Sequence, residues 1–282
     1  MERAVEVVFQ EASFFKKIID VLKCLADKAT FVFTVQGMHV QVLDAGHFSL
    51  IHINLSQNSF QSFKCTEPTD INFDLVTLAK LLKFVSPTDT LTIRANMDED
   101  IDMQLNSPID GKSTQFRLKH FDLQQDFFEI PEHNYHGKLT INVNTFNQLI
   151  QSLSGLDDSM TVRGNGGQIQ FSSKNPSVEA TTSFVTRINP GRIEDEVNVQ
   201  VTESFQVGFE LQYLQVLLNA SSFSKRVSLS FSPNFPLLIE YPLGSGGFFQ
   251  YYLAPKALDD PDPDPTLIKS LVHLLGFNSK NS

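Results

Sequence analysis

The sequence carries one pattern twice, and this internal repeat constrains the fold more than any other feature. The segment FDLVTLAKLL at 73–82 returns as FELQYLQVLL at 209–218, at an offset of 136 residues (73 to 209). A helix pattern at 14–25 returns at 146–156, at an offset of 132 residues (14 to 146). Two copies, each with two helices and many strands, predict an α+β fold with helices layered on antiparallel sheets.

Hydrophobic periodicity places four short helices and many strands along the two copies. The helices are expected at 12–25, 75–85, 145–156 and 211–220, with Phe14 of the first facing the core. Apolar runs of strand length predict strands at 5–10, 30–34, 38–43, 48–55, 59–65, 71–73, 90–95, 101–105, 115–120, 138–143, 160–163, 168–172, 177–186, 196–201, 204–209, 227–232, 236–241 and 248–253.

The segment between the copies, 121–137, is predicted to be an extended strap. It begins FDLQQDFFEIPEHNY, where Pro131 forces Ile130 into an extended backbone. A solvated tether would not need Phe127 and Phe128 among its acidic residues, so we expect the strap to lie on a surface. This pattern predicts an N-terminal domain at 1–120, the strap at 121–137 and a C-terminal domain at 138–258.

Residues 259–282 differ in kind from both copies. The run DDPDPDP at 259–265 is acidic and stiff, and it is predicted to be a tether. The segment TLIKSLVHLLGF at 266–277 has a broad apolar face and predicts an amphipathic helix. We expect this helix to dock into a groove of its own chain or of a neighbour, with a disordered tail as an equal alternative.

The charge balance limits how the chain can meet nucleic acid. A formal net charge of −10 argues against a protein that binds phosphates with its whole surface, but it leaves a local basic face open. Lysines lie opposite the apolar face of both helices in the first copy, at positions Lys16, Lys17, Lys23, Lys80 and Lys83. The two cysteines, Cys24 and Cys65, are expected to be buried thiols.

The sequence shows no residue spacing that is typical of a catalytic or metal-binding site. Asp44, His47 and Ser49 lie close in sequence, but they form no nucleophile elbow and bring no defined oxyanion donors. The seven histidines show no metal-ligand spacing. We therefore expect no catalytic residue, no metal and no cofactor, and keep a hydrolase that uses Asp44 and His47 as a remote alternative.

Several motifs together resemble the DNA sliding clamp of eukaryotes and archaea, the proliferating cell nuclear antigen family. They are VQVLDAGHFSLI at 40–51, FDL and EIPEHNY in the strap, PLLIEY at 236–241 and YYLAPK at 251–256, the last being the most specific. The resemblance covers residues 5 to about 258. It implies a non-enzymatic, nuclear, head-to-tail homotrimeric ring that encircles duplex DNA, with helices lining the bore. A viral source would place it in a viral replication compartment instead.

The resemblance also implies partners and site residues. The implied partners are double-stranded DNA, DNA polymerase and other proteins with a clamp-binding motif, and a clamp loader. The implied DNA-facing residues are Lys16, Lys17, Lys23, Lys80 and Lys83, with Lys112 as a further candidate. The implied partner groove comprises Leu43, His47, Phe48, Leu50, Phe128, Ile130, Pro131, Pro236, Tyr252, Leu253 and Ala254. The implied subunit contacts are Phe116 and Leu118 on one edge, and Val178, Ala180 and Thr182 on the other.

The sequence departs from the family where the second-copy helices would carry basic residues. Those positions hold Gln148, Gln151, Gln212 and Asn219. Any positive lining is therefore expected to be lopsided. This leaves open a related clamp that does not close as a homotrimer, such as a checkpoint-type subunit or a virus-type factor that binds DNA through its basic face.

Overall fold

A computed structural model describes residues 3–256 together with Leu271 and Leu275. These residues form two compact units. The first contains 3–42, 51–128 and 243–249, and the second contains 43–50, 129–242 and 250–256 with Leu271 and Leu275. Most of the expected helix at 266–277 and the whole tether at 259–265 lie outside the described residues.

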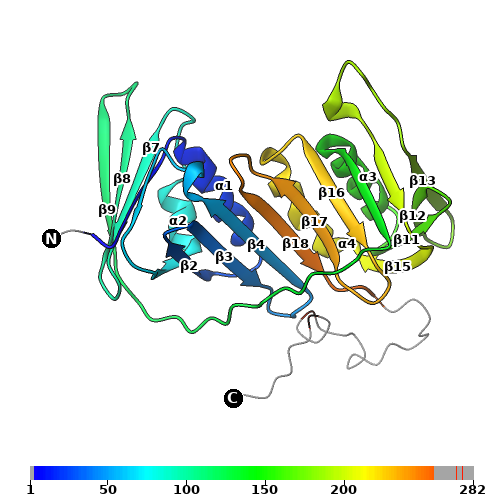
Figure 1. The fold of residues 1–282 in the computed structure, drawn as a ribbon, viewed down its shortest axis with the longest axis horizontal. Helices are drawn as coiled ribbons and strands as arrows, with labels where there is room; N and C mark the ends of the chain where they lie inside the picture. Colours follow the sequence, from blue (N-terminus) through cyan, green and yellow to red (C-terminus); the bar gives the residue numbers. More distant parts are fainter. Residues whose placement is uncertain (1–2, 257–270, 272–274, 276–282) are drawn as a thin grey trace. The chain divides into compact units, whose positions relative to one another are not determined.

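The two copies have the same order of α-helices and strands (Figure 1). The first holds β1 (Val5–Phe9), α1 (Ala12–Leu22), β2 (Lys28–Thr34), β3 (Gly37–Leu43), β4 (Ser49–Ser56), η1 (Gln57–Ser59), β5 (Ser62–Cys65), β6 (Thr69–Asp74), α2 (Leu75–Leu81), β7 (Thr90–Ala95), β8 (Ile101–Ser107) and β9 (Lys112–Leu118). The second holds β10 (Gly137–Asn142), α3 (Val143–Ser154), β11 (Ser159–Asn165), β12 (Gln168–Lys174), β13 (Glu179–Val185), η2 (Ile193–Asp195), β14 (Asn198–Val201), β15 (Phe205–Glu210), α4 (Leu211–Gln215), η3 (Val216–Ser222), β16 (Arg226–Phe231), β17 (Leu237–Pro242) and β18 (Phe248–Leu253).

Strand order repeats along with element order. The first copy contains the orders β5-β1-β7-β8-β9 and β4-β3-β2-β6, and the second contains β14-β10-β16-β17-β18 and β13-β12-β11-β15. Each strand therefore has a counterpart at the same place in the other copy. Pairing is antiparallel in both, for example between β1 and β7 and between β10 and β16. The expected α+β fold with duplicated antiparallel sheets is confirmed.

The helices start at equivalent points of the two copies. The Ala12 N–H that opens α1 donates to the Asp89 carbonyl at 2.7 Å, and the Val143 N–H that opens α3 donates to the Lys225 carbonyl at 2.9 Å. This sets the offset between these helices at 131 residues (12 to 143), and the expected 132 was wrong. Phe15, not Phe14, is the buried counterpart of Phe146.

Phenylalanine rings fill the core of each unit. In the first unit, Phe15 of α1 lies 5.0 Å from Phe9 and 6.0 Å from Phe31, ring centroid to ring centroid. In the second, Phe231 lies 5.9 Å from Phe171 and 5.6 Å from Phe205. Tilted and edge-to-face rings bury large areas without polar atoms, so this composition can supply a core without cross-links.

Two other expectations need correction. α2 ends at Leu81, and α4 ends at Gln215 before the tighter helix η3, so both α-helices are shorter than their apolar patterns. α1 likewise ends at Leu22, before the expected Leu25. Lys23 and Lys83 therefore follow their helices and do not lie inside them. Cys24, which follows α1, is exposed, and Cys65, which ends the edge strand β5, is half-buried, so neither is the buried thiol that was expected. Among the described helices, none has the length and apolarity that crossing a membrane requires.

Candidate functional site

Five lysines of the first copy lie on α1 and α2 or directly after them. α1 and α2 pack side by side in the first unit (Figure 1). Their inner faces bury Phe15, Ile18 and Leu78, which turns the lysines toward solvent. Lys23, Lys80 and Lys83 are exposed, and Lys16 and Lys17 are half-buried. Amphipathic packing thus produces a basic outer layer, named here the lysine face and defined as Lys16, Lys17, Lys23, Lys80 and Lys83.

Local partners modulate the charge of the lysine face. The Lys16 ammonium pairs with the Asp20 carboxylate one turn later. The Lys83 ammonium lies 5.4 Å from the centroid of the Phe84 ring, and Phe84 is itself 88% exposed. Lys112 is exposed too, but it opens β9 opposite Ser107 and so lies on a hairpin rather than on the helix pair. The helix lysines remain the stronger candidates for phosphate contact.

The matching helices of the second copy are uncharged. α3 reads VNTFNQLIQSLS and α4 reads LQYLQ. Gln148, Gln151, Gln212 and Asn219 are all exposed, and Asn219 takes the position that Lys83 occupies in the first copy, at the offset of 136 residues (83 to 219). Gln151 matches Asp20 and Gln212 matches Val76. With the corrected offset, Gln148 is the counterpart of Lys17 rather than of Lys16.

Asp44 organises the loop that also carries His47 and Ser49. Its carboxylate accepts the backbone N–H of Gly46 at 2.9 Å and that of Phe48 at 2.8 Å, and it also accepts the N–H and hydroxyl of Ser49. His47 has a φ of 59°, which the tight turn imposes. A carboxylate engaged with four donors of its own loop is a turn-forming group. Asp44, His47 and Ser49 do not form a relay, so the geometry argues against the hydrolase alternative.

The predicted groove residues of the second unit divide into a buried set and a more exposed set, named here the floor and the rim. The floor comprises Leu50, Tyr252, Leu253 and Ala254, which are 0%, 4%, 1% and 7% exposed. Pro236 is buried as well. Leu43, Phe48 and Ile130 are half-buried, and His47 and Pro131 are exposed. The Ala254 N–H donates to the Phe48 carbonyl at 2.9 Å, which ties the loop 43–50 to the segment after β18.

Tyr213 is a groove neighbour that the sequence patterns did not indicate. Its ring lies 5.6 Å from that of Phe48, and its carbonyl accepts the Tyr251 hydroxyl at 2.8 Å. Burial raises the pKa of Tyr213 and of Tyr251, so both phenols stay neutral. The helix pattern could have indicated that the Tyr213 ring lies outside the core, because the apolar face of α4 is formed by Leu211 and Leu214.

Amide side chains hold the strap on the first unit. The Gln41 side chain accepts the Phe128 N–H at 2.8 Å and donates to the Phe128 carbonyl at 3.0 Å. The Gln125 side chain accepts the Thr30 N–H at 3.0 Å, and Asn72 donates to the Phe121 carbonyl at 2.8 Å. These bonds replace strand pairing for an extended segment. Phe128, the remaining predicted groove residue, is half-buried at this anchor.

Aromatic stacking holds the other end of the strap within the second unit. The His133 ring stacks on Phe235, with centroids 4.0 Å apart, and Tyr135 meets the same ring edge-on at 5.7 Å. Phe235 precedes Pro236 of the groove floor, so this stack fixes the strap next to the groove residues. Burial also lowers the pKa of His133, which favours the neutral ring.

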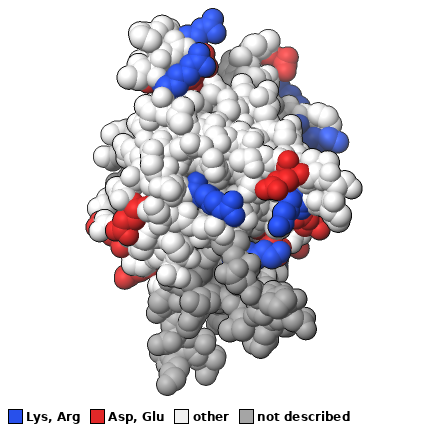
Figure 2. All heavy atoms as spheres, turned by 90° about the vertical axis from the view of Figure 1, so that its right-hand side faces the viewer, with Lys and Arg blue, Asp and Glu red and all other residues white. Residues whose placement is uncertain are grey.

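The predicted subunit-contact residues lie on two edge strands. β9 ends the order β5-β1-β7-β8-β9, and β13 ends the order β13-β12-β11-β15. Phe116 and Leu118 of β9 are half-buried; on the other edge, Ala180 is half-buried and Thr182 is exposed. Val178, 49% exposed, precedes β13 by one residue. The side that carries β13 is mostly uncharged, with basic and acidic groups scattered over it (Figure 2).

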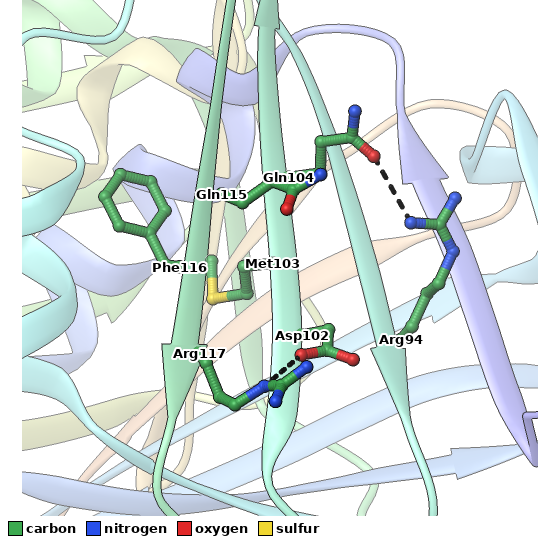
Figure 3. A pocket seen from close by; sticks show the side chains of 7 residues that line it. All are labelled: Arg94, Asp102, Met103, Gln104, Gln115, Phe116 and Arg117. Atoms are coloured by element: carbon green, nitrogen blue, oxygen red, sulfur yellow. Dashed lines mark hydrogen bonds and ion pairs between the residues drawn. The ribbon is translucent and has the colours of Figure 1, made fainter.

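A shallow polar pocket lies beside Phe116 on the first of these edges. The Arg117 guanidinium pairs with the Asp102 carboxylate at 2.9 Å, and Arg94 donates to the Gln104 amide at 3.3 Å (Figure 3). The pairing holds the pKa of Arg117 above its usual range. Its lining residues are Arg94, Asp102, Met103, Gln104, Gln115, Phe116 and Arg117.

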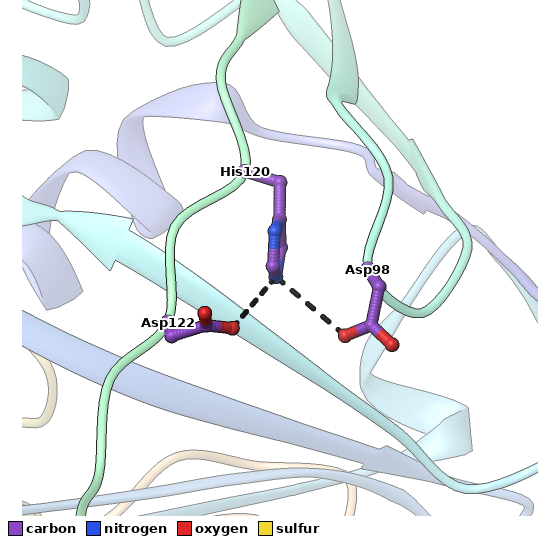
Figure 4. Close-up of side chains that lie close together, drawn as sticks. All are labelled: Asp98, His120 and Asp122. Atoms are coloured by element: carbon purple, nitrogen blue, oxygen red, sulfur yellow. Dashed lines mark ion pairs between the residues drawn. The ribbon is translucent and has the colours of Figure 1, made fainter.

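One group of possible metal ligands lies where β9 runs into the strap. The His120 Nε2 atom is 3.7 Å from an Asp98 oxygen and 3.9 Å from an Asp122 oxygen (Figure 4). Both carboxylates are largely exposed, at 79% and 99% of their side chains. This geometry suits a weak surface contact, and it does not change the expectation of no resident metal.

Comparison with known proteins found that this chain matches one protein family along most of its length. Residues 4–128 match the model "Proliferating cell nuclear antigen, N-terminal domain", and residues 129–256 match "Proliferating cell nuclear antigen, C-terminal domain". Proliferating cell nuclear antigen 2 of Drosophila melanogaster is 31% identical over 259 residues, covering 91% of this chain and 99% of the relative. Proliferating cell nuclear antigen of Chaetomium thermophilum is 27% identical over 256 residues, covering 90% and 99%.

Proposed function

Because the chain belongs to the proliferating cell nuclear antigen family, it is a DNA sliding clamp and processivity factor, and we propose that it works as a closed homotrimer around duplex DNA. The observation that carries this conclusion is the match of both family domains, in order, over 4–256. We propose the domain limits 1–120 and 138–258 with the strap at 121–137. We also propose that the clamp acts in the nucleus and without catalysis.

The lysine face is the proposed DNA contact. Lysine ammonium groups attract phosphates without reading bases, and an acidic remainder keeps the attraction local. A ring needs no tight grip, because topology holds the duplex while weak contacts let it slide. Lys16, Lys17, Lys23, Lys80 and Lys83 would supply these contacts, and Lys112 a further one.

The groove is the proposed site for DNA polymerase and other proteins with a clamp-binding motif, and for the clamp loader. Its support is a buried apolar floor at Leu50, Leu253 and Ala254 beside the half-buried rim residues Phe48 and Ile130. Apolar anchors from a partner gain most where such a floor is already free of water.

Ring closure is proposed to occur through the two edge strands. β9 of one subunit would pair with β13 of the next, so that each open edge finds a partner and six similar modules close a circle. Phe116 and Leu118 would then face Val178, Ala180 and Thr182 of the neighbour. The mostly uncharged surface around β13 supports a protein contact there rather than a phosphate contact.

The test of the proposal measures mass and DNA retention together. Light scattering should give three chains per particle, and clamps loaded on circular DNA should leave when the circle is cut. The variant Lys16→Ala/Lys80→Ala should bind DNA more weakly and with a smaller salt slope, by about 1 for each lost phosphate contact.

The matched control is Gln148→Ala/Gln212→Ala, which alters the uncharged helices of the second copy. This variant should bind DNA like the unaltered chain. A monomer at micromolar concentration that still binds linear DNA would instead support the non-closing clamp, which the uncharged helices α3 and α4 favour as the second candidate.

A further inference from the structure

Two residues from the C-terminal segment lie in the second unit although the sequence separates them from its last strand. Leu271 is 1% exposed and Leu275 is 5% exposed. The Leu271 N–H donates to the His47 carbonyl at 2.7 Å. Both side chains are buried, so Leu271 and Leu275 are held in the second unit, where Leu271 is bonded to the loop 43–50.

A backbone hydrogen bond joins these two leucines. The Leu275 N–H donates to the Leu271 carbonyl at 2.9 Å, which is the i to i+4 bond of an α-helix. Residues at this spacing project from one face, so both leucines can enter one apolar site. The groove rim supplies the acceptor, since His47 lies directly before Phe48 in the loop that is tied to Ala254.

We propose that Leu271 and Leu275 of this chain occupy its own partner groove and must be displaced before a partner binds. This inference rests on the proposed function of the groove. The occupant is aliphatic, whereas an aromatic anchor buries more area in the same site. A partner with aromatic anchors can therefore displace the segment, and a weak partner cannot.

Covalent attachment makes the occupant effective even when its intrinsic affinity is low. A tethered segment meets its site at an effective concentration in the millimolar range. The apparent affinity of any external ligand falls by the fraction of chains whose groove is open. Because attachment is within one chain, this fraction does not depend on protein concentration.

The decisive experiment compares peptide binding by full-length chains. The probe is a fluorescein-labelled synthetic peptide with one aliphatic and two adjacent aromatic anchors in one helical turn, and its binding is read by polarisation. Leu271→Ala/Leu275→Ala should bind the probe about tenfold more tightly than the unaltered chain. An unlabelled peptide of residues 264–280 should compete with the probe on this variant.

The control removes residues 278–282, which keeps both leucines and should leave probe affinity unchanged. Equal affinity of the unaltered chain and the leucine variant, or no competition by the 264–280 peptide, would overturn self-occupation while leaving the groove as a partner site. If no chain bound the probe, both self-occupation and the partner groove would be refuted, and the DNA retention experiment would still test the clamp.

Discussion

Gln41 is the residue that does most to position the strap. It is 5% exposed, and its side chain makes both hydrogen bonds to the backbone of Phe128. Replacing a buried amide that bonds two backbone groups by a methyl group removes both of these hydrogen bonds. The sequence did not indicate this role of Gln41, because a glutamine inside an apolar strand is typical of a surface position.

We predict that Gln41→Ala loosens the strap without unfolding the unit. Loss of the paired amide should cost about 1 to 3 kcal/mol of local stability. Hydrogen exchange should show faster exchange at the Phe128 amide, with little change in the β1 and β7 amides. Gln36→Ala, at an exposed position, is the control. Unchanged protection at Phe128 would contradict this role.

His52 makes the first unit sensitive to acid. Burial and the nearby His39 lower its pKa from 6.5 to about 4, so the folded chain holds a neutral ring. The unfolded chain binds a proton at higher pH than the folded chain does. The stabilisation is therefore complete above about pH 6.5 and is lost as the pH falls toward 4.

We predict that the free energy of unfolding falls by about 2 to 3 kcal/mol between pH 7 and pH 4 on account of His52. His52→Gln should flatten that part of the profile measured by urea denaturation, whereas His47→Gln, at an exposed position, should not. An NMR titration midpoint for His52 at or above 6.5 would refute the argument.

At the scale of elements, the repeat predicted the helices better than it predicted their ends. All four were found, because their apolar spacing is strong. Their C-terminal limits were overestimated where apolar residues continue after the helix, as at Leu82 and Leu217. The helix pattern placed Phe14 in the core, whereas the structure buries Phe15, so the predicted helix was displaced by one residue. Both residues are phenylalanine, and only packing distinguishes them.

The uncharged pair of helices α3 and α4 can be tested by adding charge. Gln148→Lys/Gln151→Lys should tighten DNA binding and steepen its salt dependence, because both side chains are exposed on the helix that matches α1. Gln200→Lys adds a charge on the exposed face of strand β14 and serves as the control. Equal gains in both variants would mean that net charge, rather than position, governs binding.

At the scale of the molecule, the family motifs were enough to predict the fold, whereas contacts between distant segments were seen only in the structure. The duplicated strand orders follow from two copies of one pattern. Tyr213 beside Phe48 could not be predicted, because the pair joins segments far apart in the sequence. Docking of the C-terminal segment was expected from its apolar face, but the bond from Leu271 to the His47 carbonyl was not. The site assignments for DNA, partners and subunits remain predictions.

Assembly through the edge strands predicts a mass change on a single substitution. Phe116→Asp places a charge on β9 where an apolar contact with the next subunit is proposed, so light scattering should report monomers. Phe63→Asp changes a half-buried phenylalanine on β5, the opposite edge of the same sheet, and should keep the trimer. A trimer in Phe116→Asp would exclude this edge.

The uneven distribution of lysines between the two copies has a consequence for motion. In a closed trimer, cationic and neutral helix pairs would alternate, giving the duplex three attractive sectors separated by three passive ones. The duplex would be attracted to one sector at a time, so it should move through the ring in a tilted orientation, change sectors often and experience little friction.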